Sequence, residues 1–79
     1  MISAQEALVP MLLSEVREIV FANRGACDIR GEGDEIVLTV GSITVKCDIP
    51  EIDNIFIDAR KCAIILQRKL DSIESGDTL

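Results

Sequence analysis

The stretch EIVLTVGSITVKCD, residues 35–48, decides the fold, because two segments of alternating polarity meet in it at Gly41-Ser42. Strict alternation of apolar and polar residues is typical of strands with one buried face. A two-residue connection that begins with glycine favours a tight hairpin turn, since glycine adopts positive φ angles freely. The turn sets the register of the two strands, with Val40 opposite Ile43.

A third strand is predicted before this hairpin, over residues 26–30, with residues 31–34 as the connecting loop. Closing that loop with Arg30 opposite Glu35 pairs opposite charges and gives an antiparallel meander. In the hairpin itself, Glu35 lies opposite Asp48. Like charges directly opposite each other are unfavourable, so the ladder is expected to fray there or to have a cation nearby.

The alternation leaves the meander with one apolar and one polar face. Val37 is the only apolar residue on the polar face. The residues predicted on the apolar face are Cys27, Ile29, Ile36, Leu38, Val40, Ile43, Val45 and Cys47.

A helix is predicted before the meander, with a capping box that begins at Ser3 and a glycine cap at Gly25. Pro10 interrupts it, because proline cannot donate a backbone hydrogen bond inside a helix. Two alternatives stay open: residues 4–8 form a separate first turn that kinks into the main helix, or the helix begins near Val9.

The final helix is predicted to start near Asp53 or Asp58, both acceptable N-cap residues, and to end at Gly76. Pro50 stops the strand before it. At about 100° per residue, one side of this helix faces the sheet. The residues predicted on that side are Ile55, Phe56, Ala59, Cys62, Ala63, Leu66, Leu70 and Ile73.

These elements predict an α+β fold for a single domain over residues 1–79. The expected architecture is a two-layer α/β sandwich of helix, three-stranded antiparallel meander and helix, with both helices on one sheet face. A swapped dimer, in which one helix crosses to a second copy, would fit the same pattern.

Composition narrows the classes of function. The chain has a net charge of −6, and this acidity disfavours direct binding to nucleic acid. Residues 54–70 nevertheless carry four basic groups against one acidic group, which makes the last helix a basic region on an acidic body. Apolar residues make up 48% of only 79 residues, so some apolar surface is expected to contact a second copy or a partner.

The residues needed for common catalytic and metal chemistry are scarce. The sequence has no His, Tyr or Trp, and its three cysteines, Cys27, Cys47 and Cys62, all lie at apolar positions. We therefore expect no enzyme activity, no cofactor and no metal site, and free thiols in a reducing cytoplasmic compartment. The longest apolar runs are too short for a membrane span, and no signal peptide is recognised. The carboxylates of residues 31–35 leave a divalent cation as an alternative to a plain hairpin tip.

Two surfaces are candidates for protein binding. The first is an acidic end of the sheet, which fits a basic surface of a partner protein, such as a surface that binds nucleic acid. Its residues are Asp28, Glu32, Asp34, Glu35, Asp48, Glu51 and Asp53. The second is an apolar stripe with flanking basic residues on the last helix, which we expect to form a homodimer contact opposite Glu15 or Glu18. Its residues are Ile57, Arg60, Lys61, Ile64 and Arg68, with Phe21 from the first helix.

The leading expectation is a small acidic protein-binding module, either an inhibitor or an adaptor. In size and charge alone it is similar to phage-encoded inhibitors of bacterial defence complexes and to acidic secretion chaperones. The alternatives are a homo-oligomeric assembly component that uses the apolar stripe, and a small-ligand or metal-binding module.

Overall fold

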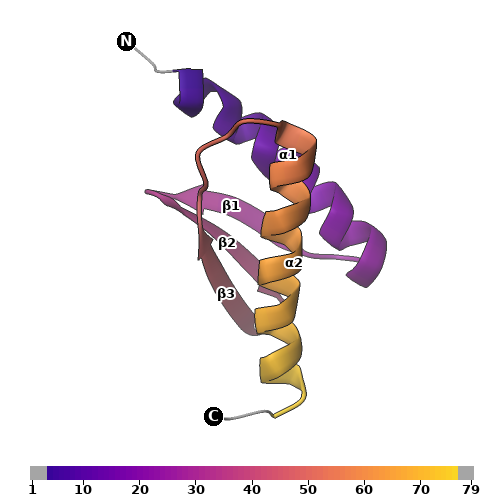
Figure 1. The fold of residues 1–79 in the computed structure, drawn as a ribbon. Helices are drawn as coiled ribbons and strands as arrows, with labels where there is room; N and C mark the ends of the chain where they lie inside the picture. The colour runs from indigo at the N-terminus through magenta and orange to yellow at the C-terminus, as the bar shows by residue number, and fades with distance from the viewer. Residues whose placement is uncertain (1–3, 77–79) are drawn as a thin grey trace.

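The computed structural model describes residues 4–76 and has two helices and one three-stranded antiparallel sheet. The elements follow the order α1 (Ala4–Arg24), β1 (Asp28–Glu32), β2 (Glu35–Val40), β3 (Ile43–Asp48) and α2 (Ile55–Glu74). Both helices lie on one side of the sheet and run in the same direction at an oblique angle (Figure 1). The predicted two-layer fold is confirmed.

The hairpin of β2 and β3 has the predicted register. Val40 pairs with Ile43, and the side-chain hydroxyls of Thr39 and Thr44 lie 3.2 Å apart on the polar face. Gly41 has a φ of 61°, while no residue other than glycine has a positive φ in the described chain. A positive φ at only the first turn position matches a type II′ turn, which suits the twist of the flanking strands.

The first strand differs from the prediction by two residues. β1 covers Asp28–Glu32 instead of residues 26–30, and Glu32 rather than Arg30 pairs with Glu35. The loop is only Gly33-Asp34, and Gly33 has a φ of 60°, so this hairpin also closes through a glycine-led two-residue turn. A shift of two residues keeps every side chain on its predicted face.

The expected fraying at the far end of the hairpin does not occur. Glu35 pairs with Asp48, and one position further the Ile49 N–H donates to the Asp34 carbonyl at 2.8 Å. The backbone ladder therefore continues past the two like charges.

The first helix is continuous from Ala4 and contains Pro10, so a start near Val9 is wrong. Its predicted cap, Ser3, lies outside the described residues. The helix ends as predicted at Gly25, whose φ of 80° is left-handed and whose N–H donates to the Phe21 carbonyl at 2.8 Å.

The N-cap of α2 is Asn54, not Asp53 or Asp58. The Asn54 side chain accepts hydrogen bonds from the Phe56 and Ile57 amides at 3.1 and 3.2 Å. Asp58 lies inside the first turn, where its carboxylate accepts from the Asp53 and Asn54 amides at 2.8 and 3.1 Å. Both acceptors together satisfy amides that the helix itself leaves without partners.

The core lies between the sheet and the helices. Its buried members are Leu12, Val16, Val20, Ile29, Ile36, Leu38, Val45, Cys47, Ile52, Ala59, Cys62, Ala63, Leu66 and Leu70. Two residues predicted to face the sheet from α2 do not: Phe56 is 68% exposed and Ile73 is 52% exposed. Val37, alone among apolar residues on the opposite face, is buried between its cross-strand neighbours Arg30 and Lys46.

Polar side chains near both ends of α1 bind other segments of the chain. Near the start of α1, the Gln5 amide donates to the Ile52 carbonyl at 2.9 Å and accepts from the Ile52 N–H at 2.6 Å. At its end, Arg24 forms ion pairs with Asp71 and Glu74 of α2. These contacts hold the connection after β3 and the end of α2 against the first helix.

Candidate protein-binding surfaces

The acidic end of the sheet is built around a row of three carboxylates. Glu32, Glu35 and Asp48 occupy directly opposite positions on β1, β2 and β3. Side chains opposite each other on one sheet face lie about 5 Å apart at their Cβ atoms, so this row concentrates negative charge. The predicted register had Arg30 in place of Glu32, so sequence reasoning missed the row.

A cation lies near each end of this row, Arg30 on β1 and Lys46 on β3. The Arg30 guanidinium donates to Glu32 at 2.7 Å and to Asp28 at 3.3 Å. The hydrogen bond from Arg30, its charge and the more distant charge of Lys46 lower the pKa of the Glu32 carboxyl below its ordinary value. Glu32 therefore stays ionised into acidic solution, and Arg30 offsets part of the negative charge at this end of the row.

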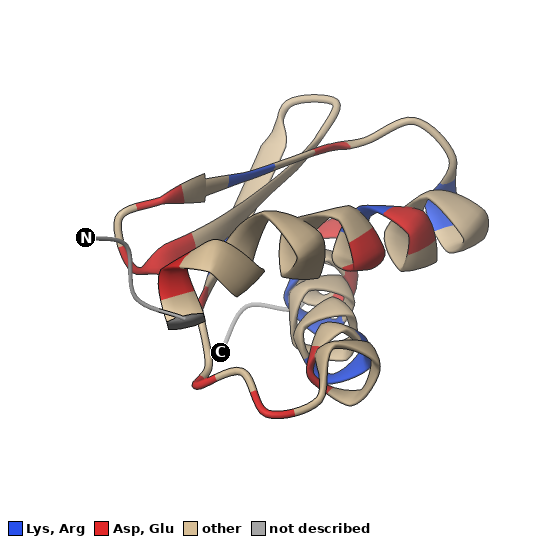
Figure 2. Cartoon of the chain, turned by 90° about the horizontal axis from the view of Figure 1, so that it is seen from above, with Lys and Arg blue, Asp and Glu red and all other residues tan. Residues whose placement is uncertain are grey.

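Other predicted acidic residues lie around the same end of the molecule. Asp34 and Glu51 line a shallow hollow of about 370 Å³ between the tip of the first hairpin, the start of α1 and the connection after β3. Asp53 follows in that connection, immediately before α2. Asp28 is separate, because it pairs with Thr39 at the other end of β1. In Figure 2, red segments surround the end of the sheet beside the N-terminal part of α1.

The stripe on α2 points away from the sheet. Ile57 is 52% exposed and Ile64 is 42% exposed, and the two lie two turns apart on one side of the helix. Arg60, Lys61 and Arg68 flank them and are also exposed. Within residues 4–76, no salt bridge involves these three basic side chains.

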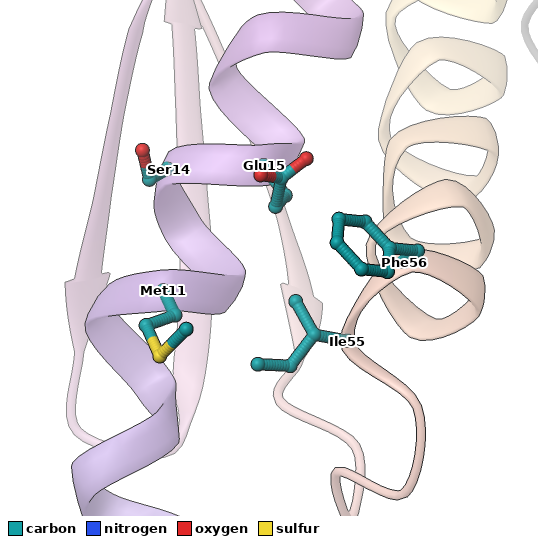
Figure 3. Close-up of a pocket in the computed structure, with 5 residues that line it drawn as sticks. All are labelled: Met11, Ser14, Glu15, Ile55 and Phe56. Atoms are coloured by element: carbon teal, nitrogen blue, oxygen red, sulfur yellow. The ribbon is translucent and has the colours of Figure 1, made fainter.

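Two exposed apolar residues that the prediction did not place on this face join it. Phe56 of α2 and Met11 of α1 line a hollow of about 270 Å³ between the two helices, together with Ser14, Glu15 and Ile55. Figure 3 shows Met11 on one wall and Ile55 and Phe56 on the other, with Glu15 projecting between the helices. Most of the lining is apolar carbon.

Phe21 lies about 80° around α1 from Met11. Phe21 is 59% exposed, but at about 100° per residue it lies about 160° around α1 from Asn23. The Asn23 side chain donates to Gln67 of α2 at 3.3 Å, so Phe21 faces away from α2. Ile65 is 46% exposed and lies about 100° around α2 from Ile64.

The cysteines have the environment of structural thiols. Cys47 on β3 and Cys62 on α2 are buried in the same core, and the neighbouring Cys47 thiol together with burial raises the pKa of the Cys62 thiol. Burial likewise raises the pKa of the half-buried Cys27 thiol. A raised pKa keeps a thiol protonated and weakly nucleophilic at neutral pH.

Within residues 4–76, no three His, Cys, Asp or Glu side chains come together as a metal ion would require. The same part of the chain has no helix that is both long and apolar enough to cross a membrane. Comparison with known proteins gave no matching family model, no similar curated protein and no similar solved structure.

Proposed function

We propose that the chain is a small, acidic, non-catalytic protein-binding module, an inhibitor or an adaptor, whose acidic end engages a basic surface of a partner protein. The observation that carries this proposal is the row of Glu32, Glu35 and Asp48 across three paired strands. A sheet holds such charges at fixed spacing. The backbone that carries these charges is already ordered before binding. Binding therefore costs less conformational entropy, which favours affinity.

The acidic end would act mainly through long-range electrostatics. Opposite potentials on two proteins steer their encounter and raise the association rate, and mobile salt weakens that effect. Basic protein surfaces commonly serve nucleic acids, because phosphate binding requires lysine and arginine. A rigid acidic partner on such a surface would compete with DNA or RNA.

The cytoplasm is the proposed compartment. Cys27, Cys47 and Cys62 are free thiols, and a reducing compartment keeps thiols free. Cys47 and Cys62 make this argument stronger, because they lie in the same core and neighbouring thiols are the ones that an oxidising compartment would join.

The proposal is tested by neutralising the acidic end and comparing protein capture. The variant carries Glu32→Gln, Asp34→Asn and Glu35→Gln. A charge-matched control carries Asp28→Asn, Asp71→Asn and Glu74→Gln, which removes the same number of carboxylates outside both the acidic end and the α2 stripe. Immobilised proteins are exposed to lysate, eluted with a salt gradient, and the eluates identified by mass spectrometry.

We expect the unchanged chain and the control to retain the same basic protein. Retention should be lost between roughly 0.1 and 0.5 M salt, where the screening length falls below about 10 Å. The neutralised variant should retain little of it. Equal retention by all three chains, or retention that ignores salt, would overturn the proposal.

A further inference from the structure

The outward surface of the helix layer combines exposed apolar side chains with charged groups that form no salt bridge within residues 4–76. Met11 and Phe56 are 55% and 68% exposed and border the hollow between α1 and α2. Next to Phe56 begins the stripe of Ile57 and Ile64 on α2. Large apolar and aromatic side chains that lie together on a surface are typical of a protein interface.

Opposite charges lie on the two helices of this same surface. Glu15 and Glu18 belong to α1, whereas Arg60, Lys61 and Arg68 belong to α2. In the described chain, none of these five side chains takes part in a salt bridge. Each helix thus carries the charge that the other helix would attract, but within one copy the groups remain unpaired.

The acidic residues of α1 and the basic residues of α2 also lie at similar positions along their helices. Glu15 and Phe56 line the same hollow, so they lie at the same height along the two helices. Glu18 is one turn beyond Glu15, and Arg60 is one turn beyond Phe56. A two-fold axis that lies between the helices and bisects the angle between them places α1 of one copy over α2 of the other at the same level along the axis.

We infer that the helix layer is the interface of a two-fold homodimer, in which Glu15 and Glu18 of each copy face Arg60 and Lys61 of the other. An interface of this kind is self-complementary, since each contact occurs twice. The Phe56 and Met11 of each copy would cover the hollow of the other. This surface lies on the opposite side of the molecule from the polar sheet face, so the inference does not depend on the acidic end.

The test is the mass of the full chain in solution at concentrations of about 100 µM, measured by light scattering and sedimentation equilibrium. We expect a dimer for the unchanged chain and a monomer for Ile57→Asp with Ile64→Asp. The matched control is Ile65→Asp, a similarly exposed isoleucine on another side of the same helix, which should remain dimeric. Circular dichroism must show the helix content of the unchanged chain in each variant.

A charge exchange tests the facing helices directly. Arg60→Glu with Lys61→Glu should weaken dimerisation at least about 10-fold, and adding Glu15→Lys with Glu18→Lys should restore it. A monomeric unchanged chain would overturn the inference. So would a folded Ile57→Asp/Ile64→Asp dimer, a monomeric Ile65→Asp control, or a charge exchange without rescue. The readout is mass alone, so these outcomes are separate from failure of the acidic end to bind a partner.

Discussion

Replacing Asp58 with alanine should destabilise the fold far more than replacing Asp53, although both looked equally suited to cap the last helix. Asp58 is only 9% exposed, and its carboxylate accepts hydrogen bonds from the Asp53 and Asn54 amides. A hydrogen bond to a charged group contributes about 1.5–3 kcal/mol to stability. In the variant, water can partly replace the lost carboxylate, because Asp53 and Asn54 are exposed residues. We therefore expect Asp58→Ala to lower the free energy of unfolding by about 2 kcal/mol.

The assay is urea unfolding followed by far-ultraviolet circular dichroism at neutral pH. For a chain of this size the urea dependence is about 1 kcal/mol per molar, so the midpoint should fall by about 2 M. Asp58→Asn retains one acceptor oxygen and should cost about half as much. Asp53→Ala should stay within about 0.5 kcal/mol of the unchanged chain, because only its backbone amide takes part. Equal losses for Asp53→Ala and Asp58→Ala would refute the reasoning.

Three other changes probe the sheet. Gly31→Val should cost about 1–3 kcal/mol in urea unfolding, because a Cβ at Gly31 would lie 3.3 Å from Leu13 Cδ1. Leu13→Ala in the same chain should recover part of this loss, and fully additive losses would contradict the contact. Gly41→Ala should cost about 1 kcal/mol, since its φ of 61° strains any side chain although the space is open. Arg30→Gln should raise the pKa of Glu32 toward its ordinary value in a carboxyl NMR titration, and an unchanged pKa would exclude the ion pair. Because the folded pKa is lowered, the stabilisation by Glu32 is present above its unfolded pKa and is lost as the pH falls through the folded pKa.

The sequence alone was sufficient to predict the two layers of the fold, but not the position and register of the first strand. Alternation assigned the residues of β2 and β3 to faces, and the glycine-led turn set their register. For β1, two registers that differ by two residues place the same side chains on the same faces. Pairing Arg30 with Glu35 looked favourable, but the tight turn at Gly33-Asp34 determined the actual register.

Two apolar residues near the ends of α2 were wrongly predicted to face the sheet, for a different reason. Helical periodicity gives directions around an axis but does not tell how far along it the sheet extends. A helix of 20 residues spans about 30 Å, whereas strands of six residues span about 20 Å. Ile73 lies in the last turn of α2, beyond the end of the sheet, and Phe56 lies on the side of α2 that faces α1. Both side chains therefore remain exposed. Ile52 is buried in an irregular connection, where no periodicity exists to indicate it.

The candidate surfaces were predictable to different degrees. Ile57 and Ile64 share one direction on a helix, so periodicity alone placed them away from the core. The hollow beside Met11 depends on how two helices pack, which no local pattern encodes. The carboxylate row depends on the register of β1, so Glu32 entered it only with the three-dimensional structure.

The double hydrogen bond between Gln5 and Ile52 has a consequence for local motion. A side-chain amide presents one donor and one acceptor in the same plane, so Gln5 serves the Ile52 backbone as a neighbouring strand would. The connection after β3 is therefore held at this point by two contacts, the buried Ile52 side chain and the first turn of α1. Hydrogen exchange at the Ile52 amide then reports the fraying of a helix 47 residues earlier in the chain, and Gln5 ties both segments into one cooperative unit.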